Sequence, residues 1–456
     1  MKNNITTIVA QATSPQASAI SIVRISGPKA FQISQTIWQP INKKSIKARQ
    51  MVLGWVVEKK TKIDQAILVS MPAPHSYTGE DVVEIHSHGA PVIADKIIEL
   101  ALGAGAKLAK PGEFTRRAYL AGKLDLTQAE AVGELIASNN ATMLKLASQQ
   151  LAGGLSKQIK AIKSSLLELA AHEAASLDFS EEDIIESSLV GQQKVLKKIN
   201  TTVSNLLANS DSLAVVKNGY NIALVGLPNA GKSSLLNSLL GFDRAIVTTQ
   251  AGTTRDTITE TIVLGGVLIK ITDTAGLRES SDKVEKIGIT RSIEELKNSD
   301  TIVVLIEPGK SKATTTYLKK NNIISFLDNK TSLILNTKSD TIASKDLSPE
   351  LSKITALDVS TKNSSGLVAL KNHLQQIATQ NNSTENLSLL TTRQLVLIKN
   401  LKAQINVCIE LIKSKTPADI VLVEYQKVIG ICNSLTGESV TQEVIDKVFS
   451  DFCIGK

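Results

Sequence analysis

Short runs of β-branched and apolar residues, separated by Pro, Gly and Ser, fill the first 120 residues of the chain. The runs typical of strands are TTIVAQA, AISIVRISG, MVLGWVV, AILVSM and DVVEIHSHG. A further segment, PVIADKIIELALGAG, has a helical pattern that ends at glycines. The pattern therefore predicts an α+β domain over residues 1–120.

The hydrophobic pattern changes to a helical period of 3.6 residues after Leu124. One apolar stripe consists of Leu151, Leu155, Ile159, Ile162, Leu166 and Leu169. A second stripe, which continues the helical region to about residue 213, consists of Val195, Ile199, Val203 and Leu206. The sequence predicts a helical segment over residues 121–213.

The period breaks at Tyr220, where NIALVG begins a series of strands that alternate with helical segments. This alternation is typical of a mostly parallel α/β sheet and predicts an α/β domain over residues 214–379. The polar stretch ATQNNSTENLS then reads as a linker.

Two more helical stripes follow the linker, within residues 380–456. They consist of Ile398, Leu401, Ile405, Cys408 and Ile412, and of Val421, Tyr425, Val428, Cys432 and Leu435. Because every amphipathic helix needs a partner, we expect the helices before and after the α/β domain to pack together. The α/β domain is then an insertion in an all-α domain, and Cys408 and Cys432 are core residues.

Composition narrows the class of protein. At 456 residues, with 42% hydrophobic and 21% charged residues, the chain is expected to be soluble and to form two to four domains. No apolar run reaches the roughly 18 residues of a membrane span, and the N-terminus lacks the pattern of a signal peptide. Three widely spaced cysteines favour a cytoplasmic location, and the scattered net charge of +8 is compatible with a polyanionic partner such as RNA.

The segment GLPNAGKSS, from Gly226 to Ser234, lies between the strand-like YNIALV and the helical SLLNSLLG. It matches GxxxxGK[ST] in the strand-loop-helix context of a phosphate-binding P-loop. In such a loop the backbone N–H groups surround phosphate oxygens, Lys232 reaches the β- and γ-phosphates, and Ser233 binds Mg²⁺.

Other motifs follow at suitable distances. In ITDTAG, Asp273 can hold the Mg²⁺ shell and Gly276 can meet the γ-phosphate, while AGTTRD offers Thr253 and Thr254 in a loop able to close on the metal. Leu277 occupies the place where many small GTPases have a water-orienting glutamine, and an alkyl chain cannot orient water. The nearby acidic candidates for that role are Glu279, Asp282 and Glu285, although an exposed charge is the commoner fate of each.

The base-reading motif is TKSD, from Thr337 to Asp340, followed by VSTK, from Val359 to Lys362. The aspartate of an NKxD-type box accepts hydrogen bonds from guanine N1 and N2, and an adenine edge offers no such pair of donors. The sequence therefore predicts GTP and not ATP. Thr337 replaces the usual Asn, which we expect to loosen the loop but to leave the carboxylate in place.

The C-terminal segment ends in DFCIGK. Gly455 and Lys456 do not fit a C-a-a-X lipidation box, so a frayed tail is the default reading. Val444, Val448 and Phe452 form a stripe that would anchor Cys453 at the end of a helix. His75, His86 and His88 suggest a metal site, but without a cluster of Cys or carboxylates a structural role is favoured.

The chain resembles the MnmE (TrmE) family of bacterial tRNA-modification GTPases. The matching segments are TIVAQAT, RISG, YTGEDVVE, PGEFTRRAYLAGKLDLTQAEA, GLPNAGKSSLLN, AGTTRD, DTAGLRES and FCIGK. The resemblance implies a folate-binding N-terminal domain, a helical domain made of two chain segments, and an inserted G domain. It also implies that the protein works with the FAD-containing flavoprotein MnmG to add an aminomethyl-type (carboxymethylaminomethyl) group to carbon 5 of the wobble uridine in tRNA. The donors would be a tetrahydrofolate derivative of the 5,10-methylene or 5-formyl type and glycine or ammonium.

The resemblance also implies site residues. The folate site carries over to Arg24, Glu84, Lys123 and Lys456. A potassium site carries over to Asn229, Thr248, Gln250 and Thr253, beside the Mg²⁺ ligands Ser233 and Thr254. Glu285 takes the water-orienting role, and Cys453 becomes a candidate for a direct chemical role near the folate. The full set expected to hold GTP is Asn229, Ala230, Gly231, Lys232, Ser233, Ser234, Thr248, Thr249, Gln250, Ala251, Gly252, Thr253, Thr254, Asp273, Thr274, Ala275, Gly276, Thr337, Lys338, Ser339, Asp340, Ser360, Thr361 and Lys362.

The family further implies a homodimer formed through the N-terminal domain. An alternative from another class is a regulatory or ribosome-associated GTPase that binds RNA and modifies nothing. The RISG, GEDVVE and CIGK segments favour the modification enzyme, because a plain switch GTPase has no need of them.

Overall fold

The computed structural model describes residues 6–42, 47–178, 182–208, 219–243, 259–264, 267–273, 293–341, 347–380 and 389–456. The chain divides into two compact units. The first contains Met1–Ile136, Ser148–Val203 and Thr391–Lys456, and the second contains Ala137–Ala147 and Ser204–Leu390. The sequence predicted four segments, with limits at residues 120, 213 and 379. The two compact units do not test these limits, which stay predictions.

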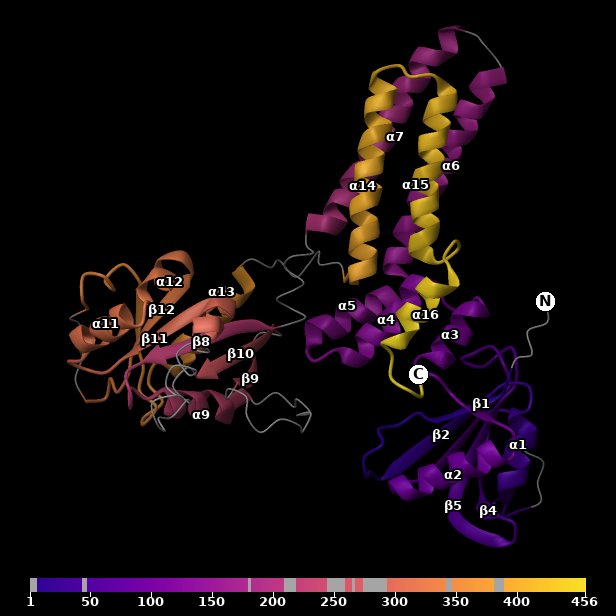
Figure 1. Cartoon of the computed structure of the whole chain (residues 1–456), viewed down its shortest axis with the longest axis horizontal. Coiled ribbons are helices and arrows are strands. Elements are labelled where there is room, and N and C mark those ends of the chain that lie inside the picture. Colours follow the sequence, from indigo (N-terminus) through magenta and orange to yellow (C-terminus); the bar gives the residue numbers. More distant parts are fainter. Residues whose placement is uncertain are drawn as a thin grey trace. The chain divides into compact units, whose positions relative to one another are not determined.

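A seven-stranded sheet forms the N-terminal part of the first unit (Figure 1). Its strands are β1 (Ile8–Gln11), β2 (Ile20–Ser26), β3 (Trp38–Pro40), β4 (Met51–Glu58), β5 (Thr61–Met71), β6 (Val82–His88) and β7 (Lys107–Leu108). Their order is β3-β4-β5-β6-β2-β1-β7, and every pair is antiparallel except β1 and β7. The predicted α+β fold is confirmed, although the short strands β3 and β7 were not predicted.

Helices α1 (Ala30–Ile37) and α2 (Pro91–Gly103) pack on one face of this sheet. Ile33 and Ile97 from the helices and Val23 and Ile85 from the strands belong to one buried cluster. A third helix, α3 (Glu113–Leu120), contributes Phe114 to a smaller cluster with Ile8 and other residues. The core therefore lies mainly between the sheet and α1 and α2.

The helical part of the first unit joins segments from both sides of the second unit in sequence. Its helices are α4 (Leu126–Ala137), α6 (Gly154–Asp178), α7 (Glu182–Ala208), α14 (Thr392–Lys413), α15 (Ala418–Thr436) and α16 (Gln442–Ser450). The ends of α4 and α7 and most of α5 (Ala141–Leu151) belong to the second unit. Helix α15 packs on both α6 and α14, so the expected packing of the early and late helices is confirmed (Figure 1). No described helix is long and apolar enough to cross a membrane.

All residues of the two stripes predicted for α14 and α15 are buried. Burial raises the pKa of the Cys408 and Cys432 thiols to about 12, as expected of core residues. Leu151 was wrongly placed in the next stripe: it ends α5, and Gly153, with φ of 87°, separates it from α6.

In the stripe predicted for α7, Ile199, Val203 and Leu206 are buried as predicted and only Val195 was wrong, whereas the stripe predicted for α16 is shifted by one residue. Val195 is only half-buried, and its neighbour Leu196 is fully buried in its place. In α16 the buried residues are Ile445 and Phe449, and this helix ends at Ser450. Cys453 therefore does not lie on a helix, contrary to the expectation.

The second unit contains a six-stranded sheet in the order β13-β12-β11-β8-β10-β9. Its strands are β8 (Tyr220–Gly226), β9 (Thr259–Leu264), β10 (Val267–Asp273), β11 (Thr301–Ile306), β12 (Thr331–Asn336) and β13 (Thr355–Asp358). All neighbours are parallel except β9 and β10, as predicted. The named helices of this unit are α9 (Lys232–Asp243), α11 (Ser311–Lys320), α12 (Ile324–Asn329) and α13 (Leu367–Gln380).

Candidate nucleotide and folate sites

The P-loop connects the end of β8 to the start of α9, as the motif predicts. Asn229 and Gly231 have φ of 65° and 94°, which turns the backbone sharply between strand and helix. Lys232 is buried, and its Nζ donates to the carbonyl oxygens of Gly226 at 2.8 Å and Leu227 at 2.9 Å. The ammonium group is thus held inside the loop, beside the helix N-terminus where phosphate binds.

Two opposite effects act on the charge of this lysine. Burial lowers the pKa of Lys232, and the negative charge of Asp273 opposes that shift. Asp273 ends β10 and is buried, and its Oδ2 accepts from the Ser233 hydroxyl at 3.5 Å. A hydroxyl and a carboxylate are oxygen ligands of the kind that Mg²⁺ prefers, so Ser233 and Asp273 fit the predicted metal position.

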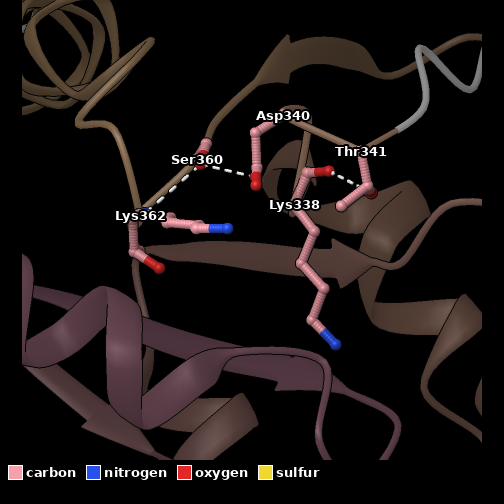
Figure 2. Close-up of a pocket in the computed structure, with 6 residues that line it drawn as sticks. Lys338, Asp340, Thr341, Ser360 and Lys362 are labelled. Carbon is pink, nitrogen blue, oxygen red and sulfur yellow. Dashed lines mark hydrogen bonds between the residues drawn. The ribbon is translucent and has the colours of Figure 1, made fainter.

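The base-reading loops surround a hollow of about 260 Å³. It is lined by Lys338, Asp340, Thr341, Ser360, Thr361 and Lys362 (Figure 2). The Ser360 hydroxyl donates to Asp340 Oδ1 at 2.6 Å, and this hydrogen bond is the main cause of the lowered pKa of the Asp340 carboxyl. TKSD and VSTK therefore meet as predicted and hold a carboxylate at the edge of a hollow.

Thr337, the first residue of TKSD, does not line the hollow and is 6% exposed. Its backbone N–H and its hydroxyl both donate to the carbonyl oxygen of Ile306, at 2.9 and 3.3 Å. These bonds attach the start of TKSD to the end of β11. The expected loosening of the loop by Thr337, and its effect on guanine affinity, stay predictions.

Many residues expected around the phosphates lie outside the described residues. They are Thr248, Thr249, Gln250, Ala251, Gly252, Thr253, Thr254, Thr274, Ala275, Gly276, Leu277, Glu279, Asp282 and Glu285. The predicted Mg²⁺ ligand Thr254, the three potassium ligands from the same loop and the water-orienting Glu285 are therefore kept as predictions.

Arg24 and Glu84, the first two expected folate residues, are direct cross-strand partners in β2 and β6. Arg24 Nε donates to Glu84 Oε1 at 2.8 Å, and the two side chains are 19% and 16% exposed. The guanidinium carbon lies 5.8 Å from the ring centre of Tyr77 and 5.5 Å from that of Phe114. Phe114 is fully buried and Tyr77 is 39% exposed, so this partly buried ion pair can bind a flat, polar heterocycle by charge-assisted hydrogen bonds and by stacking on Tyr77.

The C-terminal segment is packed against this region. The N–H of Phe114 donates to the Lys456 carbonyl at 3.1 Å, and that of Gly112 donates to the Cys453 carbonyl at 3.4 Å. Gly455 has φ of 95°, and a Cβ on it would lie 2.0 Å from the carbonyl oxygen of Gln11 in β1. The frayed-tail reading is therefore wrong, and the Cys453 thiol is free and exposed.

Lys123, the remaining folate candidate, is exposed and lies beside Gly79. Among the described residues it makes no hydrogen bond to Arg24 or Glu84. The structure therefore brings Arg24 and Glu84 into contact but does not join Lys123 to them. His86 contacts Glu84 at 3.3 Å and His88 contacts Asp64 at 2.7 Å. No group of three or more His, Cys, Asp or Glu in the described part of the chain could hold a metal ion.

Sequence reasoning missed Tyr77, Phe114 and Glu307. The Tyr77 hydroxyl lies 2.9 Å from the hydroxyl of Thr115, and burial raises the pKa of Tyr77. Glu307 follows β11 and forms an ion pair with Lys338 of TKSD. A signal was present for each, since Tyr77 and Phe114 lie inside segments that match the family and Glu307 is a carboxylate at the end of a buried strand.

Comparisons with known proteins agree over almost the whole chain. Residues 7–123 match the family described as GTP-binding protein TrmE N-terminus, and residues 126–453 match the MnmE helical domain. The tRNA modification GTPase MnmE of Thermotoga petrophila is 35% identical over 457 residues, which cover 99% of this chain and 100% of that protein. The protein of the same name from Thermoanaerobacter sp. is 36% identical over 462 residues, which cover 99% of each.

Among solved structures, Aquifex aeolicus Era bound to GDP and AlF4⁻ is 22% identical and covers 40% of this chain and 66% of its own. Its TM-score of 0.28 is too low to bear on function. The two family matches and the full-length relatives show that the chain belongs to the MnmE family of tRNA-modification GTPases.

Proposed function

We propose that this chain hydrolyses GTP to GDP and phosphate as one subunit of a tRNA-modifying complex. The complex adds an aminomethyl-type (carboxymethylaminomethyl) group to carbon 5 of the wobble uridine, using a folate one-carbon unit. Relatives that carry the name tRNA modification GTPase over the full length of the chain support the general assignment. The nucleotide site supports GTP hydrolysis, called the nucleotide half of the proposal below. The site around Arg24 and Glu84 supports the modification of tRNA, called the modification half.

The nucleotide half rests on the residues around the P-loop and the base-reading hollow. Asp340 is held as a carboxylate by Ser360 and can accept from guanine N1 and N2, for which adenine has no equivalent donor pair. Lys232 and the loop N–H groups bind the β- and γ-phosphates. Ser233 and Asp273 hold Mg²⁺, which neutralises charge on the phosphate oxygens when it is bound.

Hydrolysis also needs a group that orients water and a further positive charge. We assign the first role to Glu285. We assign the second to K⁺, held by Asn229 of the P-loop together with Thr248, Gln250 and Thr253. Asn229 supports this assignment because its amide is an oxygen ligand that lies exposed in the P-loop, three residues before α9 begins.

The modification half rests on the first unit. Arg24 and Glu84 bind the pterin part of a tetrahydrofolate derivative, while Lys123 and Lys456 are cations for the glutamate tail. We assign a direct chemical role to Cys453, whose thiol is exposed in the C-terminal segment. The partner is the FAD-containing MnmG, and the substrate of the complex is tRNA.

A homodimer through the N-terminal domain is supported by one face of the seven-stranded sheet. On the face away from α1 and α2, strand register places Ile20, Met51 and Leu53 on the same side of the sheet as Arg24 and Glu84, with Met51 in their row. These three apolar side chains are 57%, 68% and 48% exposed. An apolar face of this kind is typical of an interaction surface.

The docked tail beside the Arg24–Glu84 pair is the observation that carries the modification half, because a regulatory GTPase has no use for it. Mass spectrometry of wobble nucleosides tests it in a strain that lacks this chain. We expect uridines without the carbon-5 group in that strain and restoration by the wild-type chain. An unchanged nucleoside profile in the deletion strain would leave the regulatory GTPase as the better account.

A further inference from the structure

Glu307 lies at the junction of β11 and α11, next to the base-reading loop. It is 7% exposed at its side chain and follows Ile306, whose carbonyl anchors Thr337. Its Oε2 accepts from Lys310 Nζ at 2.5 Å, and its Oε1 accepts from Lys338 Nζ. A buried carboxylate is therefore shared between a lysine that lines the hollow and one that does not.

The pair with Glu307 decides where the Lys338 ammonium lies. Lys338 is two residues from Asp340, and both line the same hollow. Figure 2 shows the stem of Lys338 running along one side of the hollow, with its amino group turned away from the Asp340 carboxylate. Lys338 also has φ of 55°, a left-handed backbone conformation that is uncommon for residues other than glycine.

We propose that Glu307 is a positioning residue for guanine recognition: it holds the Lys338 ammonium away from Asp340 and fixes the Lys338 stem as a wall of the base site. The inference rests on the proposed GTP site. Two physical effects support it. An unrestrained ammonium two residues away would pair with the Asp340 carboxylate and compete with the guanine N1 and N2 donors. A lysine side chain also loses conformational entropy when it becomes ordered. Because the ion pair orders Lys338 before the nucleotide binds, this entropy loss does not weaken binding.

Charge around Glu307 agrees with this role. The hydrogen bonds from Lys310 and then from Lys338 lower the pKa of the Glu307 carboxyl, so the acceptor is charged throughout the neutral pH range. Lys310 provides a matched control because it binds the other oxygen of the same carboxylate and has no place in the hollow.

Titration of the full-length protein with mant-GDP tests the proposal. The variants are Glu307→Gln, Lys310→Met, Lys338→Met and the double variant Glu307→Gln/Lys338→Met, each checked by thermal unfolding. We expect Glu307→Gln to raise the Kd about tenfold and Lys310→Met to leave it within about twofold. In the Lys338→Met background, Glu307→Gln should add no further loss, because the competing ammonium is already gone.

Two results would overturn the inference. The first is a Kd for Glu307→Gln within twofold of wild type. The second is an equal loss of mant-GDP affinity from Glu307→Gln in the wild-type and Lys338→Met backgrounds, which would mean that Glu307 only stabilises the β11–α11 turn. If Glu307→Gln does not fold, Glu307→Asp tests the same point, since its shorter carboxylate should reach Lys338 less well and raise the Kd by a smaller factor. Failure of the wild-type protein itself to bind mant-GDP would instead overturn the proposed GTP site.

Discussion

The sheets of the two units are covered in different ways. The six-stranded sheet has a buried apolar cluster on each face, with Ile222 and Leu224 in one and Ala223 and Val225 in the other. The seven-stranded sheet has its main cluster under α1 and α2. Its other face carries the row of Arg24 and Glu84.

This difference determines where each unit can bind a ligand. When a parallel sheet is buried on both faces, a ligand can reach only the loops at its strand ends. Its binding residues therefore come from short sequence motifs in those loops. In the mostly antiparallel sheet, the face opposite α1 and α2 is only partly covered, and it places side chains from distant strands side by side. The comparison predicts that changes in the loops of the second unit alter GTP binding and hydrolysis, whereas changes on the first unit alter modification alone.

The largest expected effect concerns the base-reading loop. Asp340→Asn replaces the acceptor of two guanine donors by an amide that can donate to the 2-oxo group of xanthine. Because two charge-assisted hydrogen bonds are lost, the preference for GTP over XTP should fall on the order of a thousandfold. Competition between GDP and XDP for the purified protein measures it, and an undiminished preference for guanosine would show that TKSD does not read the base.

The next prediction concerns the cation proposed beside Asn229. Leu277 removes the usual glutamine, and neither the P-loop nor TTQAGTT contains an arginine, so charge that develops on the phosphate needs another cation. Hydrolysis in K⁺ should exceed that in Na⁺ at equal ionic strength by roughly a hundredfold, the cost of losing one well-placed charge contact of about 3 kcal/mol. K⁺ should also promote pairing of G domains with GDP and aluminium fluoride. Equal turnover in both salts, with no added pairing in K⁺, would exclude this mechanism and leave the GTPase assignment intact.

In the first unit, Gly455→Ala should displace the tail. A Cβ there would lie 2.0 Å from a backbone oxygen, and φ of 95° strains any other residue. We expect wobble-uridine modification to fall by roughly thirtyfold, a change equivalent to about 2 kcal/mol. GTP hydrolysis should stay within about twofold. Gly103→Ala is a matched control, because a Cβ at Gly103 meets nothing within 4 Å. If Gly455→Ala lowered GTP hydrolysis as much as modification, the two units would not have separate functions.

The same contrast between local and distant contacts explains what the sequence could predict. Lys232, Asp340 and Ser360 belong to short motifs whose local geometry brings their groups together. Arg24 and Glu84 are 60 residues apart, and their pairing depends on strand register, which local patterns do not determine. The ion pair of Glu307 with Lys338 likewise joins two strand ends, and only the packing of β11 beside β12 makes it visible.

Helices show the same limit. The stripes of α14 and α15 were predicted residue by residue because a regular period needs only local information. Leu196 replaced Val195 in the core of α7 because both residues are apolar neighbours and only the partner helix selects between them. Phe452 was assigned to a helix that ends at Ser450, although it does pack beside Phe449, with ring centres 5.3 Å apart.

Cys453→Ser tests whether the exposed thiol acts chemically. A hydroxyl is far less nucleophilic than a thiolate, so modification should fall about tenfold while GTP hydrolysis is retained. Quantification of the modified wobble nucleoside, with the tail's position checked by limited proteolysis, separates chemistry from docking. Full modification activity in this variant would reduce the role of Cys453 to its backbone contact with Gly112.

The smallest effect is expected at Thr337, where the sequence departs from the NKxD pattern. Thr337→Asn restores the usual residue in a position that is 6% exposed and tied to Ile306 through both the backbone and the side chain. Because the backbone bond alone keeps TKSD on the end of β11, and because Glu307 independently holds Lys338, the Kd for mant-GDP should change by less than about threefold, or roughly 0.7 kcal/mol. A tenfold gain in affinity would instead mean that threonine does loosen the loop, so that even in this unit the binding residues depend on more than their own motif.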